Sequence, residues 1–112
     1  MLVLSNHHQT KKTPFTYLCD ELDEQLDHAP RILLVEDSPI IQITMLAMLQ
    51  EHSGYLVDAA DTGEEAVALF SKGFDLVIMD VGLPGINGID ATKKIRELYP
   101  SNKTPIVART AH

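Results

Sequence analysis

The 112-residue chain has little of three things on which other classes of protein depend: cysteine, basic residues and long apolar runs. Cys19 is its one cysteine, so an internal disulfide is excluded and nothing indicates an oxidising compartment. Lys and Arg total 9 against 16 Asp and Glu, a formal charge of −7, which disfavours nucleic-acid binding because that activity needs a basic surface. The apolar runs are far shorter than the roughly 20 residues that span a bilayer, and the start of the chain lacks a signal-peptide pattern. We therefore expect a cytoplasmic domain that contacts neither nucleic acid nor membrane.

The composition is that of an ordinary globular protein, with 45% hydrophobic and 22% charged residues. A chain of this length can build the core of one small domain. Its pattern changes near residue 30, so we divide it into an N-terminal extension, 1–29, and a domain, 30–112. The extension carries a Thr-Pro helix start and then apolar residues at spacings of three and four, which predicts an amphipathic helix over 14–28.

From residue 31 onward, strand-like and helix-like patterns alternate. Short apolar runs that suit buried strands occur four times, at 32–35, 55–59, 74–79 and 104–108. Helical spacing and helix start and stop signals predict three helices between them, at 39–52, from Thr62 to a stop at Gly73, and at 89–99. This β-α-β-α-β-α-β order predicts an α/β doubly wound sheet of parallel strands with right-handed crossovers.

The first of these predicted helices is unusually apolar. One stripe at helical spacing is formed by Ile40, Ile43, Leu46 and Ala47. Three further apolar residues, Met45, Met48 and Leu49, widen this face. The pattern therefore predicts a well-buried helix.

Acidic residues stand where two of the predicted strands end. Glu36 and Asp37 follow the first strand, and Asp80 follows the third. Ligands of doubly wound sheets bind at the carboxyl ends of the strands, so these three carboxylates converge there if the two strands are neighbours. Crowded carboxylates repel one another, and Mg²⁺, which prefers oxygen ligands, relieves the repulsion. A carboxylate beside Mg²⁺ can also act as a nucleophile that forms an acyl phosphate.

Three segments in order resemble response-regulator receiver domains, namely ILLVEDSP at 32–39, DLVIMDVGLPGING at 75–88 and PIVARTAH at 105–112. The resemblance covers residues 31–112 without a gap and is greatest to the receivers attached to hybrid sensor histidine kinases. It implies a flavodoxin-like fold and a role in a two-component phosphorelay. The chain would be a phosphoacceptor domain, within a hybrid kinase or beside one, rather than a free-standing enzyme.

The resemblance also implies a role for each site residue. Asp80 would accept a phosphoryl group from a phosphohistidine on a histidine kinase or a histidine phosphotransfer domain. Glu36 and Asp37 would hold Mg²⁺ together with Asp80, and Gly82 would offer its backbone carbonyl to the metal. Thr110 would donate a hydrogen bond to the phosphoryl group.

The loop after Asp80 has its own expected determinants. The resemblance implies that Pro84 and Gly88 shape this loop, with Gly88 adopting a positive φ.

The sequence departs from the family at its end. Receivers of this type have five βα units, whereas the pattern here stops after the fourth strand, without the last helix-strand-helix portion and the lysine that the family places after its fifth strand. The fourth strand would then be an edge with unpaired backbone groups. Three explanations are open. The helix at 14–28 would cover the apolar surface that the missing helices leave, or two copies would pair through the open edge as a homodimer. Alternatively, the chain is a piece of a longer protein.

Three functions therefore compete. The first is the phosphoacceptor receiver, and the second is a signalling-incompetent interaction or dimerisation module that retains the acidic pocket. The third is a Mg²⁺-dependent phosphohydrolase with Asp80 as nucleophile. Haloacid-dehalogenase-type phosphatases carry a second acid two residues after their nucleophile, where this chain has Gly82, so the third hypothesis is the weakest.

Overall fold

The computed structural model describes residues 28–50 and 55–109. The helix predicted over 14–28 lies outside these ranges except for its last residue, and it stays a prediction. Within the described ranges, no helix is both long and apolar enough to cross a membrane.

The described chain alternates strands and helices as the sequence predicts. In chain order, the elements are β1 (Arg31–Val35), α2 (Pro39–Gln50), β2 (Leu56–Ala60), α3 (Gly63–Phe70), β3 (Leu76–Asp80), α4 (Gly88–Leu98) and β4 (Ile106–Arg109). The four strands form one parallel sheet in the order β2-β1-β3-β4. This architecture confirms the predicted α/β class, with strand ends that differ from the prediction by one or two residues.

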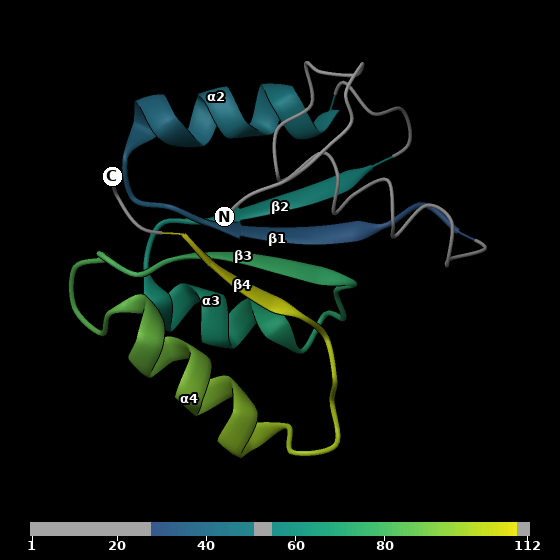
Figure 1. The fold of residues 1–112 in the computed structure, drawn as a ribbon, viewed down its shortest axis with the longest axis vertical. Coiled ribbons are helices and arrows are strands. Elements are labelled where there is room, and N and C mark those ends of the chain that lie inside the picture. Colours follow the sequence, from purple (N-terminus) through teal and green to yellow (C-terminus); the bar gives the residue numbers. More distant parts are fainter. Residues whose placement is uncertain (1–27, 51–54, 110–112) are drawn as a thin grey trace, which may run out of the picture.

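The sheet separates two apolar layers. Figure 1 shows α2 on one face of the sheet, with α3 and α4 on the other. Side chains of β1 and β3 alternate between the layers, so Ile32 and Leu34 pack on the α2 side while Leu33 and Val35 pack on the α3–α4 side. All five residues of β3 are buried. The two central strands, which lead into the acidic residues, are therefore the most buried strands of the sheet.

Two helices begin at residues whose side chains cap the first turn, Thr62 as the sequence predicts and Asn87 two residues before the predicted start at 89. The Thr62 side chain accepts a hydrogen bond from the Glu65 backbone N–H at the start of α3, over 3.0 Å. Asn87 does the same for Asp90 at the start of α4, over 2.9 Å. Each cap satisfies a backbone donor that the first helical turn would otherwise leave without a partner.

The predicted burial of α2 is wrong for three of the four residues of its stripe. Ile40 and Ile43 are 77% and 66% exposed, and Ala47 is exposed as well. The helix instead packs on the sheet through Met45 and Leu49, which are 5% and 0% exposed. Because α2 is apolar on nearly all sides, its sequence period does not single out the face that meets the sheet.

The loop between β3 and α4 uses its glycines differently from the prediction. Gly85 has a φ of 73°, whereas Gly88 is not among the described glycines with positive φ. At Gly88, a Cβ atom would overlap the backbone of Asp80 and Val81. Gly88 is therefore required for space beside the end of β3, and the expectation of a positive φ was wrong.

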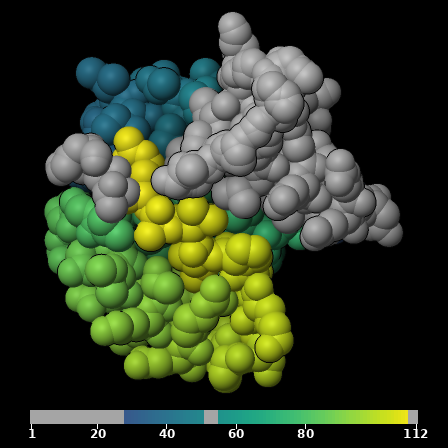
Figure 2. Space-filling model, in the orientation of Figure 1, coloured from purple at the N-terminus to yellow at the C-terminus, as the bar shows by residue number. Residues whose placement is uncertain are grey.

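The last described strand lies at an edge of the sheet. Among the described residues, β4 pairs only with β3. Figure 2 shows this last described segment, in yellow, at the surface of the molecule. The unpaired side of β4 is the edge on which the homodimer hypothesis depends, and the oligomeric state stays a prediction.

Candidate functional site

The sheet order brings the two acidic strand ends together. β1 and β3 are direct neighbours, with Val35 in register with Met79. Glu36 follows Val35 and Asp80 follows Met79, so the two acids continue the same register. The backbone N–H of Glu36 donates to Ala60 O over 3.0 Å, which keeps this residue aligned with the sheet. The predicted convergence of these strand ends is confirmed.

Three carboxylates lie close together at this edge of the sheet. Glu36, Asp37 and Asp80 each offer a carboxylate oxygen, and these oxygens lie within 4.8 Å of one another. Glu36 and Asp80 are 2% and 4% exposed, whereas Asp37 is exposed. The cluster is therefore buried on one side and open to solvent through Asp37.

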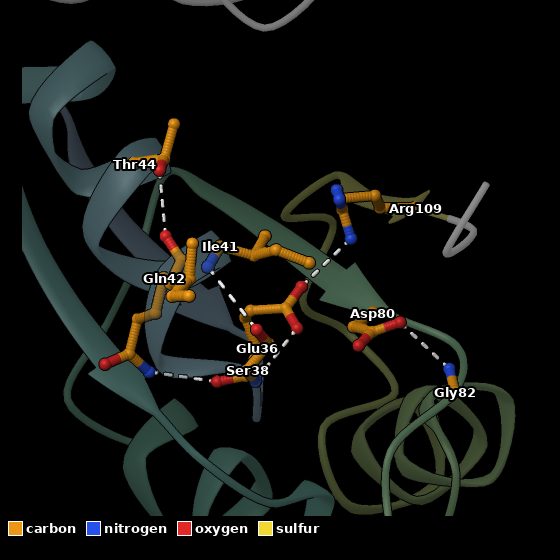
Figure 3. A network of polar contacts seen from close by, with 9 residues as sticks. Glu36, Ser38, Ile41, Gln42, Thr44, Asp80, Gly82 and Arg109 are labelled. Carbon is orange, nitrogen blue, oxygen red and sulfur yellow. Dashed lines mark hydrogen bonds and ion pairs between the residues drawn. The ribbon is translucent and has the colours of Figure 1, made fainter.

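Glu36 is held from two directions (Figure 3). Its Oε2 accepts a hydrogen bond from the Ser38 backbone N–H over 3.1 Å, and its Oε1 pairs with Arg109 Nη1 at 2.9 Å. Burial raises the pKa of the Glu36 carboxyl above its ordinary value. The Ser38 N–H and the Arg109 guanidinium act to lower this pKa, and the neighbouring Asp80 acts to raise it.

Asp80 is oriented by the turn that follows it. The Gly82 backbone N–H donates to Asp80 Oδ1 over 2.9 Å. Two further backbone bonds hold this region: Val81 N–H donates to Arg109 O beside the paired ends of β3 and β4, and Gly88 N–H donates to Val81 O within the loop. Strand pairing therefore fixes the backbone of Asp80, and the Gly82 N–H of its own loop fixes the carboxylate.

Gln42 stabilises the other border of the site. Its side-chain amide donates to the Glu36 backbone carbonyl over 2.9 Å and to Asp61 Oδ1 over 3.0 Å. These bonds join the turn after β1 to the end of β2. They position the backbone that carries Glu36 and Asp37.

The donor set fits a hard divalent cation. Three carboxylates in one group, two of them almost fully buried, carry a concentration of negative charge that a cation would relieve. Mg²⁺ takes oxygen ligands and usually keeps several waters, which the exposed side at Asp37 would admit. The arrangement can therefore hold a cation beside a nucleophilic carboxylate.

Most of the predicted site residues fall at this edge. The structure brings together Glu36, Asp37 and Asp80, and it places the Gly82 backbone against Asp80. Thr110 lies outside the described residues, so its predicted role is not tested. Arg109 also belongs to this site, although the sequence alone assigned it no role. The feature that could have indicated it is a basic side chain at the end of an apolar strand, at the edge where the acids converge.

Comparison with known sequences identifies relatives for this arrangement. The family model described as the response regulator receiver domain matches residues 32–112. The chain is 35% identical over 103 residues, 85% of its length, to the aerobic respiration control sensor protein ArcB of Escherichia coli. It is 44% identical over 73 residues, 64% of its length, to hybrid signal transduction histidine kinase B of Dictyostelium discoideum. These matches span only 13% and 4% of the two relatives, so the chain corresponds to a small part of each.

Solved structures share the fold. The response regulator TrrA of Thermotoga maritima, crystallised with Mg²⁺ and BeF, is 42% identical and superposes with a TM-score of 0.65. That match covers 74% of this chain and 70% of TrrA. A complex of the histidine kinase ThkA with TrrA also matches, with a TM-score of 0.64, 42% identity and coverage of 73% of this chain and 69% of that one. The fold described above thus has counterparts of known structure.

Proposed function

This chain belongs to the response regulator receiver domain family, and we propose on that basis that Asp80 accepts a phosphoryl group from a phosphohistidine with the help of Mg²⁺. The family membership confirms the resemblance that the three sequence motifs predicted. The observation that carries the proposal is the cluster of Glu36, Asp37 and Asp80, with carboxylate oxygens within 4.8 Å of one another. Of the three, Asp80 stands at the end of the central strand β3, where a strand and a turn fix it.

The transfer follows from the position of Asp80. One carboxylate oxygen attacks the phosphorus of the phosphohistidine, so a P–O bond forms as the P–N bond breaks. The electron pair of the broken bond stays on the imidazole nitrogen, and Asp80 carries the acyl phosphate. The Gly82 N–H, which donates to Oδ1, orients the carboxylate for this attack.

The acidic neighbours of Asp80 would hold the metal. We assign Glu36, Asp37 and Asp80 as carboxylate ligands, directly or through water, and the backbone carbonyl of Gly82 as a further ligand. When bound, Mg²⁺ would neutralise charge that develops on the transferred phosphoryl group. The TrrA structure, which contains Mg²⁺, supports this assignment by similarity.

The partner would be a histidine kinase or a histidine phosphotransfer domain. The ThkA complex with TrrA supports this partner, because TrrA is similar to this chain. The similarity to hybrid signal transduction histidine kinase B supports a place within a hybrid kinase or beside one. We also propose that Thr110, in its family position after β4, donates a hydrogen bond to the phosphoryl group.

We propose that the domain begins at residue 30 and that 1–29 is an extension. The family match, which begins at residue 32, supports this boundary. We further propose a cytoplasmic location. The one cysteine, Cys19, cannot form an internal disulfide, which fits a reducing compartment.

The experiment that tests the function is the intact mass of the protein after incubation with Mg²⁺ and acetyl phosphate. We expect a gain of one phosphoryl group that Asp80→Asn abolishes, because the amide is a poor nucleophile of the same shape. Asp90→Asn, the same change at an exposed position on α4, is the matched control and should retain the gain. Labelling of Asp80→Asn at the wild-type level would show that the acceptor is another residue.

A further inference from the structure

Arg109 makes a long-range ion pair across the candidate site. Its Nη1 lies 2.9 Å from Glu36 Oε1, and the two residues are 73 positions apart in the sequence. Arg109 ends β4 and Glu36 follows β1, while β3 with its terminal Asp80 lies between those strands. The arginine therefore reaches across the strand end that carries the nucleophile, as Figure 3 shows.

The pair is shielded from solvent. The side chains of Arg109 and Glu36 are 21% and 2% exposed. Of the ion pairs between residues in 28–50 and 55–109, it is the least exposed: Lys72 and Asp58, for comparison, are 50% and 33% exposed. A charge-assisted hydrogen bond gains strength where water is excluded, because solvent screening is weaker there.

Arg109 binds the Glu36 carboxylate, which a metal would need as a ligand. Glu36 Oε1 accepts from Arg109 and Oε2 accepts from Ser38, so both oxygens already have partners. A divalent cation that takes an oxygen of Glu36 brings a second positive charge to the same carboxylate. The two cations repel one another, so the binding of either weakens the binding of the other.

We propose that Arg109 is the counter-ion of the acidic cluster in the metal-free protein, and that it exchanges with the divalent cation at Glu36. This inference rests on the metal-binding part of the proposed function. The exchange explains how two almost fully buried carboxylates persist without a metal: the guanidinium compensates their charge until the cation arrives. Arg109 is thus a positioning residue that sets how tightly the site holds its cation.

The test is the Mg²⁺ affinity of the full chain, measured by titration calorimetry for the wild type, Arg109→Gln and Arg109→Lys. Removal of the competing charge should tighten Mg²⁺ binding by at least about fivefold in Arg109→Gln. Arg109→Lys keeps the positive charge but loses the planar guanidinium group. Its Mg²⁺ affinity should therefore lie between those of the wild type and Arg109→Gln. If Arg109 had a purely structural role, Arg109→Gln would instead bind Mg²⁺ more weakly than the wild type.

Lys72→Gln is the matched control. It removes one positive charge and one ion pair, at the opposite end of the sheet, where the Lys72 carbonyl accepts from the side chain of Arg31, the first residue of β1. Its Mg²⁺ affinity should equal that of the wild type. If Lys72→Gln tightened Mg²⁺ binding as much as Arg109→Gln, the effect would depend only on net charge, and the proposed exchange would be overturned.

A double-mutant cycle with Glu36→Gln and Arg109→Gln gives a readout that needs no phosphorylation. The two residues should be coupled in the melting temperature of the metal-free protein, and the coupling should disappear in saturating Mg²⁺. Coupling that persists in Mg²⁺ would overturn the exchange while leaving the metal site intact. A wild type that does not bind Mg²⁺ at all would overturn the metal site and the exchange together.

Discussion

Gly88 lies against the backbone of Asp80, so closely that a Cβ atom at Gly88 would overlap the Asp80 carbonyl group. The first residue of α4 thus touches the last residue of β3, and the loop between them returns to the strand that it leaves. The position of the candidate nucleophile therefore depends on the absence of a side chain eight residues later.

This contact predicts that Gly88→Ala destabilises the protein. The methyl group would meet backbone atoms of Asp80 and Val81, which cannot move aside without displacing the strand end. We expect a loss of about 1–3 kcal/mol in the free energy of unfolding, measured by urea denaturation without metal.

Gly82→Ala is the control for this prediction. A Cβ at Gly82 would lie 3.7 Å from Asp80 Oδ1, an ordinary contact, and Gly82 has no positive φ. Its free energy of unfolding should change less than that of Gly88→Ala. Equal losses in the two variants would contradict the steric explanation.

Asp37 should be needed for metal affinity although it is exposed. Asp37→Ala removes one of the three clustered carboxylates, and we expect Mg²⁺ affinity to fall by at least about tenfold in a calorimetric titration. Glu97→Ala removes an exposed carboxylate on α4, outside the cluster, and should leave the affinity unchanged. Equal affinities for the two variants would refute the carboxylate site.

The same residue should have opposite effects on stability with and without metal. Asp37→Asn removes one of three like charges, so it should stabilise the metal-free protein by about 0.2–1 kcal/mol. In saturating Mg²⁺ it should lower the melting temperature relative to the wild type, because a ligand is lost. Thermal melts in EDTA and in Mg²⁺ measure both signs, and a lower melting temperature in EDTA would refute the repulsion.

The two faces of α2 should respond differently to truncation. Leu49→Ala empties a fully buried position and should cost about 2–5 kcal/mol of unfolding free energy. Ile43→Ala changes a side chain that is 66% exposed and should cost less than about 0.5 kcal/mol. Similar losses by chemical denaturation would mean that α2 packs through the stripe that the sequence alone suggested.

Much of the site could be predicted because its determinants are local. Glu36 and Asp80 directly follow apolar runs that form strands, and parallel strands end at a common edge of the sheet. Arg109 could not be assigned in the same way. Its partner is 73 residues away, and only the strand order β1-β3-β4 brings the two side chains within reach.

The sequence by itself determined the alternation of strands and helices, the helix start at Thr62, and the acids at two strand ends, because each depends on neighbours along the chain. Only the tertiary structure decided which face of α2 is buried, why Gly88 lacks a side chain, and which cation faces Glu36. These features arise where segments distant in the sequence are packed together, and local patterns carry no information on the distance between such segments.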